Sequence, residues 1–167
     1  VWESTVEFSI KSAEAGRGKC GCAVVGVFES RKPSAAAAAL DRAAGGYLAS
    51  VMRRGDMEGK AGSTLLLHNV PGTACERVLL VGLGSAAGFG ERQYREAVAA
   101  AVRALHATGA GDAELHLTSL AVGRRDAAWR VQQAVAVAAE CGYRFDRMKS
   151  RKDNGEPALK RLALRVD

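Results

Sequence analysis

The sequence predicts one α/β domain with a mixed β-sheet of about six strands and helices on both faces. Three observations lead to this class. Short apolar segments alternate along the chain with longer amphipathic ones, as in sheets covered by helices. Two apolar segments near the middle are separated only by "PGTACE", which allows antiparallel neighbours and makes the sheet mixed. The 167 residues suffice for one well-buried core, so we expect residues 1–167 to form a single domain.

The predicted strands are recognised by continuous apolar runs or by alternation of apolar and polar residues. "CAVVGVFE" is a continuous run typical of a central strand, whereas "VEFSI" alternates as a half-buried strand does. The predicted strands cover residues 6–10, 22–29, 63–70, 77–84, 113–120 and 159–166.

The predicted helices lie between these strands. The alanine-rich helix 34–44 begins at Ser34, a suitable N-cap, and is broken by the glycine pair that follows it. A short helix covers residues 47–54 and stops at Gly55. Longer helices are predicted over residues 91–108 and 127–148, each with an apolar stripe along one face.

Charge and composition exclude few functions. The chain has 24 Lys and Arg against 18 Asp and Glu, a formal charge of +6, which permits an acidic partner without requiring one. No apolar run reaches the roughly 18 residues of a membrane span. The start "VWESTVEFSIK" lacks the basic and apolar parts of a secretory leader. We therefore expect a cytoplasmic protein without a membrane partner.

The four cysteines do not show the spacing of a disulfide framework. They are Cys20, Cys22, Cys75 and Cys141. Cys20 and Cys22 could supply half of a metal site, but no second pair completes it. We therefore interpret the cysteines as buried free thiols in a reducing compartment.

The other chemically active residue types form no recognisable catalytic motif. The three histidines, at positions 68, 106 and 116, lack metal-binding spacing such as H-E-x-x-H. No serine lies in a G-x-S-x-G context. Asp56 and Glu58, in "RRGDMEGK", are interpreted as turn and cap residues. The sequence therefore predicts no catalytic residue and no metal ligand.

The stretch "RVLLVGLGSAAGFGERQYREAVAAAVRAL" raises the question of nucleotide binding. Gly82, Gly84 and Ala87 satisfy the relaxed dinucleotide fingerprint G-x-G-x-x-A. The helix, however, is expected to begin only near Glu91, and no acidic residue follows at the distance used for ribose binding. We favour a tight strand-to-helix turn of small residues. The alternative is a phosphate loop, because "SAAGFG" resembles that of ADP-ribose-binding macro domains.

A longer segment carries a family resemblance. Residues 46–84, "GYLASVMRRGDMEGKAGSTLLLHNVPGTACERVLLVGLG", resemble the N-terminal domain of the cytosol (leucyl) aminopeptidase family, particularly its bacterial branch. "VEFSI", "CAVVGVFE", "ERQYREAVAAAVRAL" and "WRVQQAVAVAAE" occur in the family's order with about its spacing. The match runs from about Val6 to the end and is strongest in "RRG-x-x-EGK-x-G"; "VWEST" precedes the family's usual start.

This resemblance implies a non-catalytic, macro-domain-like N-terminal domain of a larger leucyl aminopeptidase that removes N-terminal amino acids from peptides. In the family, a C-terminal catalytic domain holds two divalent metal ions, manganese or zinc, around an N-T-D-A-E-G-R motif. That motif is absent from the sequence. No catalytic or metal-binding residue is therefore carried over, and the ions are expected in a catalytic domain outside these residues.

The resemblance also implies partners. The domain is expected to contact its own catalytic domain and to support a homo-hexamer in which it limits access to the active sites. Some bacterial relatives also bind DNA, and the basic residues that could contact phosphates here are Arg53, Arg54, Lys149, Arg151 and Lys152. A DNA-binding regulatory module and an ADP-ribose-binding macro-like module are the alternative functions.

Overall fold

A computed structural model of the chain describes residues 6–12, 18–148 and 159–166, of which 143–148 are described by their backbone alone. The strands are β1 (Glu7–Lys11), β2 (Ala23–Phe28), β3 (Lys32–Pro33), β4 (Thr64–His68), β5 (Arg77–Gly84), β6 (Asp112–Leu115) and β7 (Arg161–Arg165). The helices are α1 (Ala35–Ala43), α2 (Tyr47–Arg53), α3 (Glu91–His106) and α4 (Ala127–Met148), with short 3-10 turns η1 (Glu29–Arg31) and η2 (His116–Ser119).

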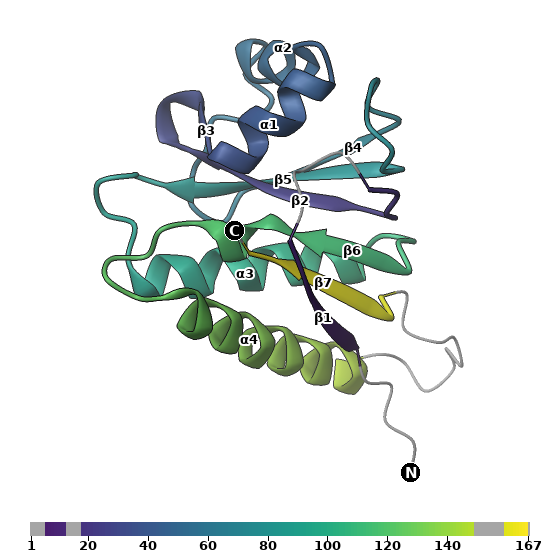
Figure 1. Ribbon diagram of the computed structural model, residues 1–167, viewed down its shortest axis with the longest axis vertical. Coiled ribbons are helices and arrows are strands. Elements are labelled where there is room, and N and C mark those ends of the chain that lie inside the picture. The colour runs from purple at the N-terminus through teal and green to yellow at the C-terminus, as the bar shows by residue number, and fades with distance from the viewer. Residues whose placement is uncertain (1–5, 13–17, 149–158, 167) are drawn as a thin grey trace.

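The strands form one mixed sheet in the order β1-β7-β6-β2-β5-β4, and the two-residue β3 pairs with β2 (Figure 1). The central strand β2 is parallel to both β5 and β6. At one edge β4 runs antiparallel to β5, with Thr64 opposite Val81 and His68 opposite Arg77. The predicted mixed sheet and its antiparallel pair of neighbouring strands are confirmed, although β4 lies at the edge of the sheet and not at its centre.

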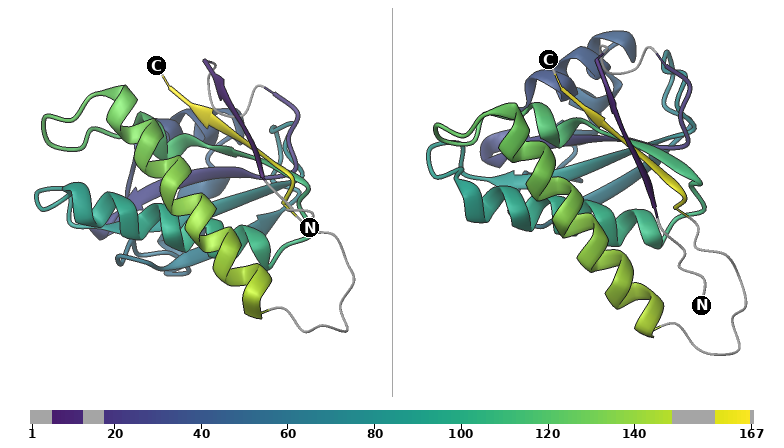
Figure 2. Two further views of the ribbon diagram at one scale, coloured as in Figure 1. Left: turned by 90° about the horizontal axis from the view of Figure 1, so that it is seen from below. Right: turned by 60° about the horizontal axis from the view of Figure 1, so that its bottom comes forward.

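Helices cover both faces of the sheet, as predicted. Alternation along β5 sends Leu79, Val81 and Leu83 into the core cluster beneath α3 and α4. Val78 and Leu80 belong to the second cluster, beneath α1 and α2. Figure 2 shows α3 and α4 side by side on one side of the sheet, with α1 and α2 on the other. Because both faces of β5 are buried, its sequence is apolar at nearly every position.

Local interactions explain where the helices start. The Ser34 side chain accepts a hydrogen bond of 3.2 Å from the Ala37 amide and caps α1, as predicted. Asp41 accepts bonds from the Leu48 and Ala49 amides, which satisfies two donors at the start of α2. A hydrogen-bonded aspartate in α1 therefore fixes the position of the short helix that follows.

Polar and aromatic contacts join α3 to α4. The buried Tyr94 hydroxyl donates to the Arg130 carbonyl at 2.7 Å, and its ring lies 5.6 Å from that of Trp129. The guanidinium groups of Arg95 and Arg125 lie 5.7 and 5.4 Å from the Trp129 ring centre. Trp129, with the guanidinium groups of Arg95 and Arg125 against its ring, therefore helps to hold α3 and α4 together.

One predicted strand is shorter than expected. Residues 113–120 were expected to be extended, but β6 ends at Leu115 and His116–Ser119 form the 3-10 turn η2. The Thr118 hydroxyl donates to the Leu115 carbonyl, and the Ser119 hydroxyl donates to the His116 carbonyl. These local side-chain hydrogen bonds favour a tight turn over an extended strand.

Candidate functional site

The C-terminal ends of the parallel strands are where open α/β sheets bind ligands, so this edge is the first candidate site. Here η1 follows β2, the loop 85–90 follows β5, and η2 follows β6. The chain between α2 and β4, residues 55–63, also reaches the C-terminal ends of the parallel strands, where it bonds to the end of β5. We call residues 55–63 the edge segment.

The edge segment occupies the backbone donors of the glycine motif. The Gly82 amide donates to the Ser63 carbonyl at 2.7 Å, and the Gly84 amide donates to the Gly59 carbonyl at 2.9 Å. The Gly62 amide returns a bond of 3.1 Å to the Gly82 carbonyl. The two amides that a phosphate group would need from Gly82 and Gly84 are therefore already bonded to the chain itself.

Two glycines allow this close approach. A Cβ atom at Gly82 would overlap the Lys60 carbonyl oxygen, and a Cβ atom at Gly59 would overlap the Phe28 carbonyl. Gly59 also has a φ of 92°, which side-chain-bearing residues rarely adopt. The structure thus gives Gly82 a packing role in the contact between β5 and the edge segment.

Polar and charged side chains surround the start of α3. The helix begins at Glu91, as predicted, and the Gly90 amide donates to the Gln93 side chain at 3.1 Å. The Glu91 carboxylate pairs with Arg125 and lies 3.8 Å from Arg95. A carboxylate at a helix N-terminus is stabilised by the positive end of the helix dipole, and here two arginines also neutralise its charge.

Two shallow hollows adjoin the edge segment. One, of about 310 Å³, is lined by Glu29, Ser30, Arg31, Glu58 and Lys60. The other, of about 190 Å³, shares Glu58 and Lys60 and also includes Asp56. The charged side chains that line them are exposed, so each hollow is an open surface of mixed charge.

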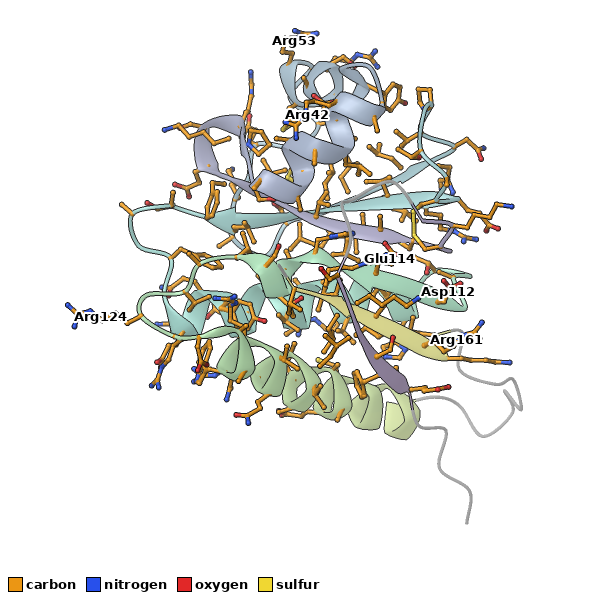
Figure 3. All side chains as sticks on the ribbon, viewed as in Figure 1. Arg42, Arg53, Asp112, Glu114, Arg124 and Arg161 are labelled. Carbon is orange, nitrogen blue, oxygen red and sulfur yellow. A yellow bond between two sulfur atoms is a disulfide. The ribbon has the colours of Figure 1, made fainter. Side chains whose placement is uncertain are left out.

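The structure places only part of the predicted phosphate-contacting set. Arg53 and Arg54 are exposed at the end of α2, and Figure 3 shows Arg53 pointing away from the sheet. Lys149, Arg151 and Lys152 lie outside the described residues. Arg124, which sequence reasoning did not select, projects from the loop before α4, on a different side of the fold from Arg53 (Figure 3).

The histidines lie apart on different elements. His68 is exposed on β4, His106 is buried on α3, and His116 is buried in η2 rather than on the predicted strand. Among the side chains of residues 6–12, 18–142 and 159–166, no three of His, Cys, Asp or Glu are grouped so that they could hold a metal ion.

The interpretation of all four cysteines as free thiols is wrong. Cys20 and Cys75 form a disulfide, with Cα atoms 4.6 Å apart (yellow bond in Figure 3). They were not paired from the sequence because they are 55 residues apart and meet only because β2 and β5 are neighbours. Cys22 is a buried free thiol, and burial raises its pKa to about 12.

A buried charged cluster, which the sequence did not indicate, connects β6 to β7. Glu114 pairs with Arg165, and its second carboxylate oxygen lies 3.5 Å from His116 Nε2. All three side chains are buried. Burial alone raises the pKa of Glu114, but the contacts with His116 and Arg165 outweigh it and hold that pKa below the usual value.

The strand order and the helices on both faces are those of an α/β domain with the macrodomain fold. The macrodomain of Mycobacterium tuberculosis DarG superposes with a TM-score of 0.65 at 11% identity, over 96% of this chain and 98% of that one. A mutant of tomato leucine aminopeptidase gives a TM-score of 0.71 at 20% identity, over 96% of this chain but 32% of that one. These likenesses establish the fold alone.

Sequence comparison then gives the family. The N-terminal domain of the cytosol aminopeptidase family matches residues 24–152, so the chain belongs to that family. A probable cytosol aminopeptidase of Dechloromonas aromatica is 50% identical over 162 residues, which is 97% of this chain and 32% of the relative. One from Methylobacillus flagellatus is 51% identical over 161 residues, 96% of this chain and 32% of the relative. The chain thus spans about a third of these relatives.

Across the described residues, none of the helices has both the length and the apolar character needed to cross a membrane.

Proposed function

We propose that this chain is the non-catalytic N-terminal domain of a dimetal leucyl aminopeptidase, an enzyme that removes N-terminal amino acids from peptides. The observation that carries the proposal is the coverage: nearly the whole chain aligns with only a third of each relative. The other two thirds of the relatives provide room for a separate catalytic domain. Two divalent metal ions, manganese or zinc, are proposed for that domain, where they would activate the attacking water.

The role proposed for the domain is to assist assembly of a homo-hexamer and to limit access to the active sites. Its surface supports an outward position. Among the described residues, Ile10 on the edge strand β1 is the one large hydrophobic side chain that is exposed, at 63%. A domain whose described surface carries no extended apolar patch is suited to the outside of an assembly, so we assign the principal apolar contacts between subunits to the catalytic domain.

The gene and a deletion variant test this proposal together. Translation beyond residue 167 should reach an N-T-D-A-E-G-R motif. Light scattering should show a hexamer for the full-length protein, and deletion of residues 1–167 should weaken assembly or increase hydrolysis of larger peptides relative to leucine p-nitroanilide. A gene that stops without the motif, or a deletion variant with unchanged assembly and peptide preference, would reject the proposed role.

DNA binding is the second candidate, and the exposed arginines of α1 and α2 favour it. Arg42 lies on α1 and Arg53 at the end of α2, followed by the exposed Arg54 (Figure 3). The acidic residue of α1, Asp41, is engaged by two amides of α2. Its charge remains, but three arginines outnumber this one carboxylate, so the outer surface of α1 and α2 has an excess of positive charge, suited to phosphate contacts.

A gel-shift assay at low and moderate salt tests the second candidate. The double variant Arg53→Ala/Arg54→Ala should weaken binding and reduce its salt dependence. The matched control is Arg92→Ala/Arg103→Ala, which removes the same charge from exposed positions of α3. Equal loss in both double variants would indicate a nonspecific charge effect, and no binding by the starting protein would reject this candidate.

A cytoplasmic location is proposed from the relatives, whose names describe cytosol aminopeptidases. The cytosol keeps most thiols reduced. A disulfide between Cys20 and Cys75 therefore requires its own explanation.

A further inference from the structure

We propose that Cys20 and Cys75 form a reversible redox site that exchanges with small disulfides and thiols of the glutathione class and controls how firmly the chain before β2 is held. This inference concerns regulation and does not depend on the aminopeptidase proposal. It rests on where the pair lies and on what the pair holds together.

The two cysteines are placed side by side by the sheet. Cys20 lies three residues before β2 and Cys75 two residues before β5, and these strands are parallel neighbours. The Glu76 amide donates to the Cys20 carbonyl at 3.0 Å. The thiols are therefore held together by backbone pairing that does not depend on the disulfide, so the reduced pair is ready to close again.

The pair lies just below the surface at the end of the sheet opposite the edge segment. Cys20 is 7% exposed and Cys75 is 4% exposed. Their chain neighbours Lys19, Ala74 and Glu76 are exposed. Local opening of either short segment would bring a sulfur atom to solvent, without unfolding of the core.

The disulfide also holds a segment over the buried charged cluster. A Cβ atom at Gly18 would lie 3.4 Å from Glu114 Oε1 and 3.5 Å from Arg165 Nη2. Cys75 Sγ lies 3.4 Å from the Gly18 carbonyl oxygen. Oxidation thus fixes residues 18–22 between the Glu114–Arg165 pair and the turn before β5, and reduction removes the covalent part of that attachment.

The chemistry balances with a glutathione-type disulfide as oxidant. One protein thiolate attacks a sulfur of the oxidised glutathione and releases one glutathione thiolate, which leaves a mixed disulfide on the protein. The second protein thiolate attacks that protein sulfur and releases the second glutathione thiolate. The protein loses two electrons and two protons, and the oxidised glutathione gains them as two thiols.

The nearby thiol of Cys22 does not compete. Its pKa is raised to about 12 by burial, so almost none of it is the reactive thiolate at neutral pH. Although Cys22 is only two residues from Cys20, it is therefore not expected to exchange with the Cys20–Cys75 pair.

The direct test is a redox titration of the unmodified chain. The protein is equilibrated without oxygen in buffers that range from reduced to oxidised glutathione, approached from both directions, and its thiols are trapped with a maleimide for mass spectrometry. Cys20 and Cys75 should change together from labelled to disulfide-bonded at one common ratio, and Cys22→Ala should leave that ratio unchanged. Labelling of both cysteines at every ratio, or a disulfide that persists in excess dithiothreitol, would overturn the proposal.

Two further measurements test what the pair controls. Amides 18–22 should exchange hydrogen at least tenfold faster in the reduced than in the oxidised protein. The oxidised form should melt about 10 °C higher, since it closes a loop of 55 residues. Cys20→Ser should show the amide exchange and melting temperature of the reduced protein in both reducing and oxidising buffer. In oxidising buffer it should retain glutathione on Cys75, because no second thiolate displaces it. Equal amide exchange in the two redox states contradicts control of the segment before β2.

Discussion

Gly82 and Lys60 are packed so closely that position 82 has no room for a side chain, because a Cβ atom there would overlap the Lys60 carbonyl oxygen. This relationship explains the glycine motif after β5. The glycines that match a nucleotide fingerprint admit the chain's own edge segment, and their amides donate to Ser63 and Gly59.

Gly82→Ala should therefore destabilise the domain by about 1–3 kcal/mol, the usual cost of overpacking a close contact. Gly88→Ala is the matched control, since no atom lies within 4 Å of a Cβ there. It should change the free energy of unfolding by less than about 0.5 kcal/mol. Urea denaturation measures the free energy of unfolding of both variants. Equal values for the two would contradict a close contact at Gly82.

The same geometry predicts that the isolated domain does not bind ADP-ribose, although its fold is that of a macrodomain. The edge segment already occupies the Gly82 and Gly84 amides, which would otherwise be free to bind a phosphate group. Isothermal titration calorimetry with ADP-ribose should give no heat beyond dilution. A saturable titration that Gly84→Ala abolishes would show that this edge binds the ligand after all.

Glu114 makes stability dependent on pH in the acid range. Its pKa in the folded protein is lower than its usual value, so the unfolded chain binds the proton more readily. Glu114 therefore contributes its full stabilisation above the unfolded pKa, and this contribution is lost as the pH falls through the folded pKa. Thermal melting between pH 3 and pH 7 should show this loss in the starting protein.

Glu114→Gln should be less stable than the starting protein at pH 7 by roughly 3 kcal/mol, because it leaves Arg165 buried without its carboxylate partner. Its melting temperature should also fall less steeply on acidification. The control Glu96→Gln breaks a surface pair with Arg92 and should cost less than about 0.5 kcal/mol. If the melting temperatures of Glu114→Gln and the starting protein fell equally steeply with pH, Glu114 would not be the source of the acid-range loss of stability.

Ser34→Ala should remove the cap of α1 and cost about 1 kcal/mol, because the Ala37 amide loses its acceptor. Ser34→Asp should retain most of the stability, since a carboxylate can accept the same bond. Denaturant midpoints compare the three proteins directly. An alanine variant as stable as the starting protein would mean that the cap contributes nothing.

Local patterns were sufficient for most of the architecture. The apolar runs of residues 22–29 and 77–84 indicated strands buried on both faces, and Ser34 before an alanine run indicated a helix start. The short turn "PGTACE" indicated the antiparallel pair β4–β5. Each of these signals depends on residues close together in the sequence.

The features that were missed depend on distant parts of the chain. The pairing of Cys20 with Cys75 can be predicted only once β2 and β5 are known to be parallel neighbours. In the same way, the contact of Glu114 with Arg165 requires that β6 and β7 are known to be neighbours. The turn η2 was missed because residues 113–120 alternate between apolar and polar as a strand does. This pattern does not show that the Thr118 hydroxyl donates to the Leu115 carbonyl and stabilises a turn. The spacing of these residues along the sequence gives no indication of these contacts.

The non-catalytic role of the domain is tested by hydrolysis of leucine p-nitroanilide by residues 1–167 alone, with manganese present, beside the full-length protein at equal molar concentration. We expect no release of p-nitroaniline above a manganese-only blank by residues 1–167, and clear turnover by the full-length protein. Turnover by residues 1–167 that increases with protein concentration and is abolished by a metal chelator would contradict the non-catalytic role.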